Sequence, residues 1–540
     1  MVDILLIQPP IADYYHTPKR TIPYGLASIA AAVALKGFSV DILDAMATGK
    51  SRIIALPEAL EHLTPFYGRA DRSPFALFHH YRHFGYSLEH IGRQVKASGA
   101  FLVGIAALFT AYSDMALAVA RVVKASLPHC TVVLGGHHPT VLPAAVMAEP
   151  AVDLVIRGEG EAGLPLLASA LRDGGDLADV PGIVLRNADG SLHVGQPVLC
   201  RDLDRLPVPA FELIRRDFYQ RSGRDGIVTV AGRGCPLACS YCATGAASWM
   251  GFRQRSVSAV LREIRAASAG RRVGLIDFED ENLTVDQRWF LELLEGIRGC
   301  FNESPPELRA MNGLFPPTLT PVVVQAMKIS GFKVLNLSLG SADSGQLRRF
   351  NRPDVRAAFD QALGCARREG LAAVGYIIVG APDQDPLTSV DDLLFLACRR
   401  VLAGVSVFYP APGSADYVRC RARNLLPNTY AGMRSTALPI DQRTSRRDAA
   451  TLLRLGRILN FIKHLNAIGV PVPLPAPVKE WLDPALDRRK VGLILLAGFF
   501  RDGGIRGVDP DGRVYSHAVS DRLCCRFLDG LRADPVLPAS

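Results

Sequence analysis

The sequence predicts an α/β protein with an N-terminal Rossmann-like, doubly wound domain, then a partial barrel of six β/α units, then a mainly helical C-terminal region. Short apolar runs alternate with helical patterns over residues 1–165, and this alternation restarts near residue 223 and continues to about 430. A chain of 540 residues is also too long for one hydrophobic core, so several domains are expected.

The first domain, residues 1–165, is predicted from apolar runs that suit buried strands. The first run ends at Pro9 and Pro10, and continuous apolar strands are typical of a parallel sheet covered on both faces. A helical pattern over 24–38 follows, and an aromatic- and His-rich insert at 46–98 interrupts the alternation. The remaining strands are predicted at 39–45, 101–108, 131–136 and 153–161.

Residues 166–222 are predicted to be a linker with a small hairpin that turns at Asp189 and Gly190. The predicted barrel occupies 223–430, and its six strands and their polar ends lie at 227–234, 273–284, 307–314, 333–343, 372–384 and 405–417. In the C-terminal region, 431–540, Thr444 and Ser445 precede a long amphipathic helix. The apolar run at 491–500 is about half the length that spans a bilayer, so we expect it to be buried core.

Composition excludes several classes of protein. The excess of 61 Lys and Arg over 52 Asp and Glu gives a net charge of +9, but it is scattered, so no nucleic-acid partner is expected. No signal peptide is expected, because Asp3 lies inside the first apolar run. The eleven cysteines, three of them in one motif, favour a reducing, cytoplasmic location.

That motif is Cys235, Cys239 and Cys242, within the stretch GRGCPLACSYCATG at 232–245. Three thiolates at this spacing can bind three irons of an iron-sulfur cluster and leave one iron without a protein ligand. A structural zinc site is the alternative, although it needs a fourth ligand and no His or Cys stands nearby to supply one.

The C-x3-C-x2-C loop, with Tyr241 before its last cysteine, resembles that of the radical S-adenosylmethionine (SAM) superfamily. The resemblance implies a 4Fe-4S cluster on the three cysteines, with SAM bound to the open iron and cleaved to a 5'-deoxyadenosyl radical. It also implies SAM contacts at the later strand ends, from Glu279, Asp280, Ser338, Gly380 and Tyr409. A solvated acidic loop, and a Tyr409 that simply packs, are the alternatives.

The order of strands in residues 1–165 resembles the cobalamin-binding domain that precedes the barrel in one branch of this superfamily. The resemblance implies that cobalamin contacts loops at two strand ends, through Gly135, Gly136, His137, Gly158 and Glu159. The sequence contains no D-x-H-x-x-G, so no residue matches a lower axial histidine. A domain that has lost its ligand and only shapes the substrate channel remains an alternative.

These resemblances lead to the hypothesis of a cobalamin-dependent radical SAM methyltransferase that acts on an unactivated carbon of a small-molecule substrate. An electron donor such as flavodoxin or ferredoxin is then expected as a partner. Two alternatives stay open: a cobalamin-assisted radical cyclisation or rearrangement, and a non-catalytic iron-sulfur and cobalamin sensor or scaffold. The substrate and the oligomeric state do not follow from the sequence.

Overall fold

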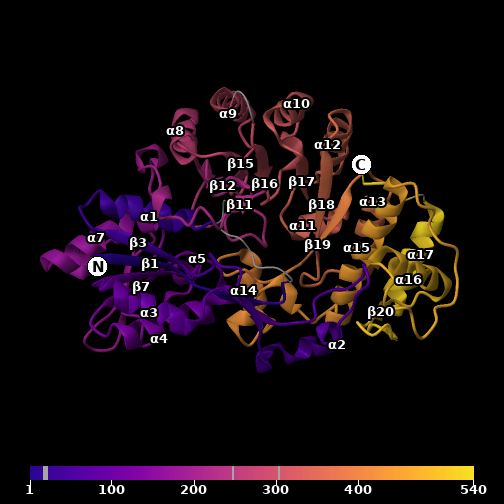
Figure 1. The fold of residues 1–540 in the computed structure, drawn as a ribbon, viewed down its shortest axis with the longest axis horizontal. Coiled ribbons are helices and arrows are strands. Elements are labelled where there is room, and N and C mark those ends of the chain that lie inside the picture. Colours follow the sequence, from indigo (N-terminus) through magenta and orange to yellow (C-terminus); the bar gives the residue numbers. More distant parts are fainter. Residues whose placement is uncertain (16–21, 246–247, 302–304, 535, 540) are drawn as a thin grey trace.

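The computed structural model describes residues 1–15, 22–245, 248–301, 305–534 and 536–539. Figure 1 shows the N-terminal domain on the left, the strands of the second domain in the upper middle, and the C-terminal helices on the right. The two strand-containing domains lie side by side, with the short helices α5 (His137–Val141) and α14 (Ala415–Ala422) near their junction.

The first domain is built on a seven-stranded sheet with the order β10-β9-β8-β7-β6-β1-β3. Its first five strands along the chain are parallel, and their order reverses between β1 and β6, where a doubly wound sheet has its ligand crevice. The predicted Rossmann-like fold is therefore confirmed. The strands are β1 (Ile4–Gln8), β3 (Val40–Asp44), β6 (Leu102–Ala106), β7 (Thr131–Gly135), β8 (Leu154–Ile156), β9 (Ile183–Arg186) and β10 (Leu192–Val194).

The hairpin predicted at Asp189 and Gly190 is part of this sheet. Strand β9 pairs antiparallel with β8, and this pairing places apolar residues of both strands opposite one another, Val155 with Val184 and Ile156 with Ile183. An antiparallel edge on a parallel sheet is a common arrangement. The hairpin therefore extends the first sheet and does not stand apart as a linker element.

Helices cover both faces of the first sheet, which explains its continuous apolar strands. Leu5 and Ile7 face one buried core, while Ile4 and Leu6 face the other. One layer contains α3 (Leu88–Ser98) and α4 (Ser113–Ser126), and the other contains α1 (Tyr24–Ala34) and α7 (Gly160–Asp173).

The end of the predicted insert supplies α3, the crossover helix between β3 and β6. The rest of the insert contributes α2 (Thr64–Tyr67) and two strands of a small antiparallel sheet. Its strands are β2 (Ile11–Asp13), β4 (Ser51–Ile53) and β5 (Arg82–Phe84).

The second domain has the six predicted parallel strands, in chain order. They form two sheets, joined by single bridges between Leu308 and Phe332 and between Leu314 and Leu337. Strands β12 and β19 are not paired with each other in the described chain, so the barrel is partial as predicted. The strands are β12 (Arg224–Thr229), β15 (Val273–Phe278), β16 (Glu307–Ala310), β17 (Val334–Gly340), β18 (Ala372–Val379) and β19 (Leu402–Val407).

Helices alternate with these strands and cover the outer side of the barrel (Figure 1). Several begin at a polar cap whose side chain accepts a backbone N–H, namely Ser256, Asp286, Thr320 and Asp385. The helices are α8 (Val257–Ser268), α9 (Gln287–Cys300), α10 (Pro321–Ser330), α12 (Arg356–Arg368) and α13 (Pro386–Ala397), and the short α11 (Ser344–Arg349) follows the end of β17.

The C-terminal region is mainly helical and packs beside β19. Its first helix, α15 (Arg446–Ala467), begins with a capping box of Ser445 and Asp448. The run at 491–500 lies within α16 (Arg488–Asp502) and is largely buried, as predicted, and among the described residues no helix could span a membrane. The region ends with β20 (Arg506–Val508), β21 (Val514–Ser516) and α17 (Asp521–Ala533).

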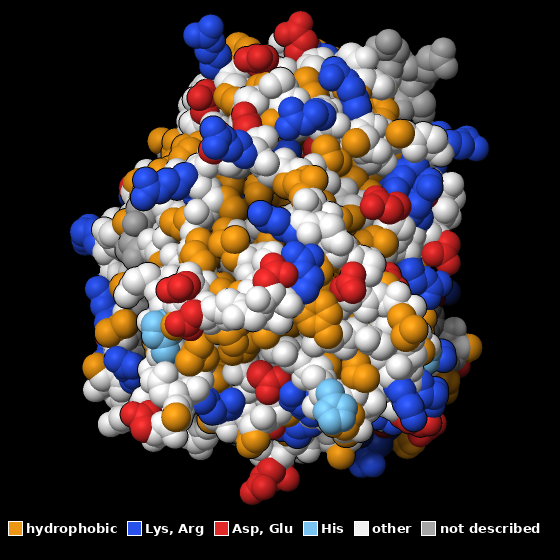
Figure 2. All heavy atoms as spheres, turned by 90° about the vertical axis from the view of Figure 1, so that its left-hand side faces the viewer, with side chains coloured by type: hydrophobic (Ala, Val, Ile, Leu, Met, Phe, Trp, Pro, Cys, Tyr) orange, Lys and Arg blue, Asp and Glu red, His pale blue; other side chains and the backbone are white. Residues whose placement is uncertain are grey.

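The surface of the first domain carries charges of both signs. Figure 2 shows Lys and Arg interspersed with Asp and Glu on this face, around a central area where hydrophobic side chains gather. On this face the charge is scattered, as the sequence predicts.

Candidate active site

The cysteine loop begins where β12 ends and is closed by a short two-stranded ladder. This neck pairs β13 (Gly232–Arg233) with β14 (Arg253–Gln254). Gly234 follows with a φ of 77°, and a Cβ at this residue would lie 2.0 Å from the carbonyl oxygen of Gly251. Only glycine tolerates this approach, so the local sequence fixes how the loop closes.

Backbone hydrogen bonds within the loop hold the segment that contains the three cysteines. The N–H of Cys235 donates to the carbonyl of Thr244 at 3.1 Å, and the N–H of Cys242 donates to the carbonyl of Cys239 at 3.1 Å. Cys235 and Cys239 are buried and Cys242 is half-buried, and none of them is in a disulfide.

Two side chains from later strand ends donate toward these sulfurs. The Nδ2 of Asn282 lies 3.6 Å from the Sγ of Cys235, and the Nη1 of Arg352 lies 3.6 Å from the Sγ of Cys239. Donors of this kind stabilise thiolates that ligate iron-sulfur clusters. The donor set therefore fits a cluster, in which each thiolate binds a different iron. No group of three His, Cys, Asp or Glu in the described ranges is arranged to hold a single metal ion.

The acidic loop after β15 contains two of the predicted SAM residues, and they differ in their surroundings. The buried carboxylate of Asp280 accepts the N–H groups of Ala231 and Gly232, at 3.1 and 2.6 Å, and burial raises its pKa to about 7. Asp280 therefore holds the backbone that leads into the cysteine loop. Glu279 is exposed, and the Nδ2 of Asn312 donates to both its carbonyl and its carboxylate.

The other predicted SAM residues lie at the ends of β17, β18 and β19. The hydroxyl of Ser338 donates to the carbonyl of Leu314 at 3.0 Å and lies 3.1 Å from the Nη2 of Arg352. Gly380 has a φ of 77°, and the side chain of Tyr409 is 40% exposed. These strand ends therefore share one edge of the barrel with the cysteine loop.

The crevice edge of the first sheet carries exposed apolar side chains. Leu108 and Phe109, which follow β6, are 54% and 56% exposed. Gly136, after β7, has a φ of 117°, and a Cβ there would meet the carbonyl oxygen of Ala107 at 2.9 Å. An apolar shelf beside a glycine turn fits a large, flat ligand such as a corrin, which would cover these side chains.

The two histidines after β7 are engaged within the protein. The Nε2 of His137 lies 3.0 Å from the carbonyl oxygen of Pro412, in the loop after β19. His138 is buried, its Nδ1 lies 3.1 Å from the hydroxyl of Thr110, and burial lowers its pKa to about 4. His137 therefore links the first domain to the barrel.

Gly158 and Glu159, also predicted at the cobalamin site, contact other parts of the chain. A Cβ at Gly158 would lie 2.1 Å from the carbonyl oxygen of Val198. The carboxylate of Glu159 binds Arg253 at 2.7 Å and Arg233 at 3.1 Å. Burial raises the pKa of Glu159, but the two arginines outweigh burial and hold it below its usual value.

No role is assigned to Arg233, Arg253 or Arg352 from the sequence alone. Arg233 stands two residues before the first cysteine of the motif, and that proximity was the available signal. Nothing local in the sequence marks Arg253, because its partner Glu159 lies far away along the chain.

The loop after β19 contacts both the first domain and the cysteine loop. A Cβ at Gly413 would lie 3.2 Å from the Cγ1 of Val141 and 3.8 Å from the Cβ of Ala243. The carboxylate of Asp416, at the start of α14, accepts a hydrogen bond from the hydroxyl of Ser240 at 2.8 Å. The backbone N–H of Asp416 donates to the carbonyl of Ser240. The ligand edges of the two domains therefore meet at this loop.

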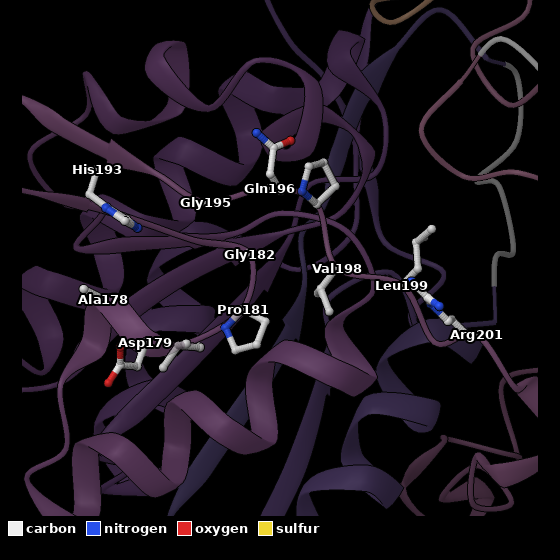
Figure 3. A pocket seen from close by; sticks show the side chains of 12 residues that line it. Ala178, Asp179, Pro181, Gly182, His193, Gly195, Gln196, Val198, Leu199 and Arg201 are labelled. Atoms are coloured by element: carbon white, nitrogen blue, oxygen red, sulfur yellow. The ribbon is translucent and has the colours of Figure 1, made fainter.

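A surface pocket of about 500 Å³ lies elsewhere, beside the β9–β10 hairpin. Figure 3 shows its lining, with His193 and Asp179 near one end and Arg201 near the other. None of the predicted cofactor residues lines it, although Val198 in its lining pairs with Gly158.

Two family models match the chain, one in each of the two domains. The B12 binding domain matches residues 79–168, and the radical SAM superfamily matches residues 229–393. These matches account for all three predicted cofactors, a 4Fe-4S cluster, SAM and cobalamin.

Two curated proteins are similar to parts of this chain. An uncharacterized methyltransferase, PH0819, of Pyrococcus horikoshii is 27% identical over 62% of this chain and 72% of its own length. The anaerobic magnesium-protoporphyrin IX monomethyl ester cyclase of Synechocystis is 32% identical over 32% of this chain and 34% of its own.

Among solved structures, the cobalamin-dependent S-adenosylmethionine radical enzyme OxsB with aqua-cobalamin bound superimposes with a TM-score of 0.64. The superposition covers 98% of this chain and 75% of OxsB, at 12% identity, and it shows a shared fold. From the family matches and the fold together, we conclude that this chain is a radical SAM superfamily enzyme that carries a B12-binding domain in front of its radical SAM domain.

Proposed function

We propose that this enzyme is a cobalamin-dependent methyltransferase that transfers a methyl group to an unactivated carbon of a small-molecule substrate. The observation that carries the proposal is the junction at the loop after β19. Through this loop, the strand-end loop of the B12-binding domain at His137 and the cysteine loop at Ala243 lie against the same few residues. A methyl donor held at one edge would thus lie close to a radical formed at the other.

When bound, the cluster and SAM supply a carbon-centred radical, and cobalamin supplies a methyl group. The protein holds and orients these groups and excludes water from them. Cys235, Cys239 and Cys242 would hold the cluster. Asp280 would position the loop, since its carboxylate is taken up by two backbone N–H groups, which leaves Glu279 as the carboxylate for the SAM amino group.

The remaining contacts with SAM and cobalamin are proposed because the residues concerned lie at the carboxyl ends of the strands in each domain. Ser338, Gly380 and Tyr409 would contact SAM at the ends of β17, β18 and β19. Gly135, Gly136 and the apolar Leu108 and Phe109 would contact cobalamin. A flavodoxin or ferredoxin would supply electrons to the cluster.

The main rival is a radical cyclisation or rearrangement without methyl transfer, and several relatives of this chain are cyclases. A non-catalytic sensor or scaffold is a third candidate. The alignment of six strand ends with the cysteine loop favours catalysis, because a sensor would need no SAM site.

An anaerobic assay with methyl-labelled SAM separates these candidates without knowledge of the substrate. The reconstituted enzyme is incubated with cobalamin and a strong reductant, and 5'-deoxyadenosine, S-adenosylhomocysteine and labelled methylcobalamin are measured. A methyltransferase forms labelled methylcobalamin together with S-adenosylhomocysteine. Formation of 5'-deoxyadenosine without label on cobalamin would support the cyclase, and absence of all products would support the scaffold.

Two cysteine variants control this assay. Cys239→Ala should abolish 5'-deoxyadenosine, because it removes a cluster ligand. Cys525→Ala changes an exposed cysteine in α17, far along the chain from the motif, and should leave every product at the wild-type level.

A further inference from the structure

The neck of the cysteine loop carries two arginines directly opposite each other. Arg233 on β13 and Arg253 on β14 are register partners in the antiparallel ladder. Like charges opposite each other destabilise such a pair, so this ladder needs counter-charges to stay closed.

The counter-charges come from the B12-binding domain. Glu161 lies 2.6 Å from the Nη2 of Arg233, and Glu159 binds both arginines, with two hydrogen bonds from Arg253 at 2.7 and 3.0 Å. The side chains of Glu159 and Glu161 are 7% and 5% exposed, and those of Arg233 and Arg253 are 18% and 15% exposed. Two cations and two anions are thus enclosed together at the boundary of the domains.

A barrel carboxylate lies close to the same group. The Oε2 of Glu281 accepts the N–H of Gly234 at 3.1 Å, and burial raises the pKa of Glu281 while Arg233 and Arg253 lower it. No hydrogen bond joins Glu281 to either arginine among the described contacts. The carboxylate partners are therefore Glu159 and Glu161 for Arg233, and Glu159 for Arg253.

The two glutamates lie at the start of α7, in the first domain. Glu159 precedes α7 and Glu161 lies in its first turn, where carboxylates also suit the helix dipole. Glu159 also accepts the N–H of Cys200 at 2.6 Å, and Arg253 donates to the carbonyl of Cys200 at 2.7 Å. The segment after the β9–β10 hairpin is therefore clamped between the domains at this point.

We propose that Glu159 and Glu161 are positioning residues, which act through Arg233 and Arg253 to fix the cysteine loop relative to the cobalamin-binding edge. This role replaces the cobalamin contact that the sequence predicts for Glu159. The ion pairs of Glu159 and Glu161 and the contact of His137 with Pro412 then join the B12-binding domain to the radical SAM domain at two separate points. The cluster-to-cobalt separation is then set by charges of the first domain, not by the barrel alone.

The test measures that separation directly in the protein loaded with both cofactors. Pulsed electron paramagnetic resonance on partly reduced samples reports the magnetic coupling between cob(II)alamin and the reduced cluster, which falls steeply with distance. Glu161→Gln removes one counter-charge and leaves the contacts of Glu159 in place. We expect full iron and cobalamin content but loss of most of the coupling, or a broad distribution in place of a single value.

Two further variants make the result specific. The exchange pair Glu161→Arg with Arg233→Glu should restore the coupling, because it keeps the balance of charges. Tyr219→Phe removes a different buried bond that ties the first domain to the linker, the one from Tyr219 to Asp44, and should leave the coupling unchanged.

The proposal would be overturned if Glu161→Gln kept the wild-type coupling with both cofactors bound, or if Tyr219→Phe changed it as much. A corrin contact at Glu159 makes a different prediction: Glu159→Gln would weaken cobalamin binding, while Arg253→Gln would not. Under the positioning role, Glu159→Gln and Arg253→Gln both reduce the coupling, and the double variant loses less than the sum of the two single losses, because the two residues share one ion pair.

Discussion

Gly234 is the residue at which a single added methyl group should do most damage to the cysteine loop. Its φ is 77°, and a Cβ there would lie 2.0 Å from the oxygen and 2.8 Å from the carbon of the Gly251 carbonyl. The obstacle is backbone, which cannot rotate away as a side-chain end could. The substitution Gly234→Ala must therefore open the neck of the loop.

The cost has two parts. A left-handed conformation costs about 1–2 kcal/mol for a residue with a Cβ. An overpacked contact of this kind adds about 1–3 kcal/mol. The total destabilisation is about 2–5 kcal/mol, and it distorts the loop that contains the three cysteines. We therefore expect both lower stability of the apo protein and poor retention of iron after reconstitution.

A matched control separates strain from the clash. Gly223 has a similar φ of 72° with no atom within 4 Å of its added Cβ, so Gly223→Ala should lose only the conformational part, about 1–2 kcal/mol, and keep its iron. Stability is measured by urea denaturation and iron by metal analysis after desalting. The reasoning fails if Gly234→Ala retains wild-type iron and is no less stable than Gly223→Ala.

Three further substitutions test individual buried charges. Arg352→Met removes a donor beside the Sγ of Cys239 and should make the cluster potential more negative, which a redox titration followed by electron paramagnetic resonance would detect. Arg434→Met leaves the buried carboxylate of Asp13 without its cation and should cost about 3–5 kcal/mol in urea denaturation; a loss below 1 kcal/mol would contradict this. Burial, together with the charges of Arg454 and Arg69, lowers the pKa of His517 more than Asp71 raises it, so below its ordinary pKa of about 6.5 the unfolded chain binds more protons and stability falls with falling pH. His517→Gln should flatten this part of the pH profile, and an unchanged slope would exclude the assignment.

Local spacing was enough to predict the strands, and it is the basis on which the three cysteines are predicted to bind the cluster. The three cysteines lie within one loop, and the positions that follow each barrel strand are set by the period of the strands themselves. For the same reason the capped helix after Ser445 and the buried run in α16 could be predicted. Each of these features depends on residues that are near neighbours in the chain.

The candidate site was only partly predictable, because contacts there join distant segments. Glu279 and Asp280 are adjacent and equally acidic, yet only Asp280 is buried against the backbone of the cysteine loop. Glu159 followed a strand end, as a ligand contact would, but its charge is matched by arginines of the other domain.

By itself, therefore, the sequence determined that this protein carries an iron-sulfur loop, a SAM-binding barrel and a B12-binding domain, since each motif is local. Only the tertiary structure decided how these parts face one another, through contacts such as Glu161 with Arg233 and His137 with Pro412. The physical reason is that a buried charge takes whichever counter-charge the folded chain brings within reach, and sequence spacing does not record that choice.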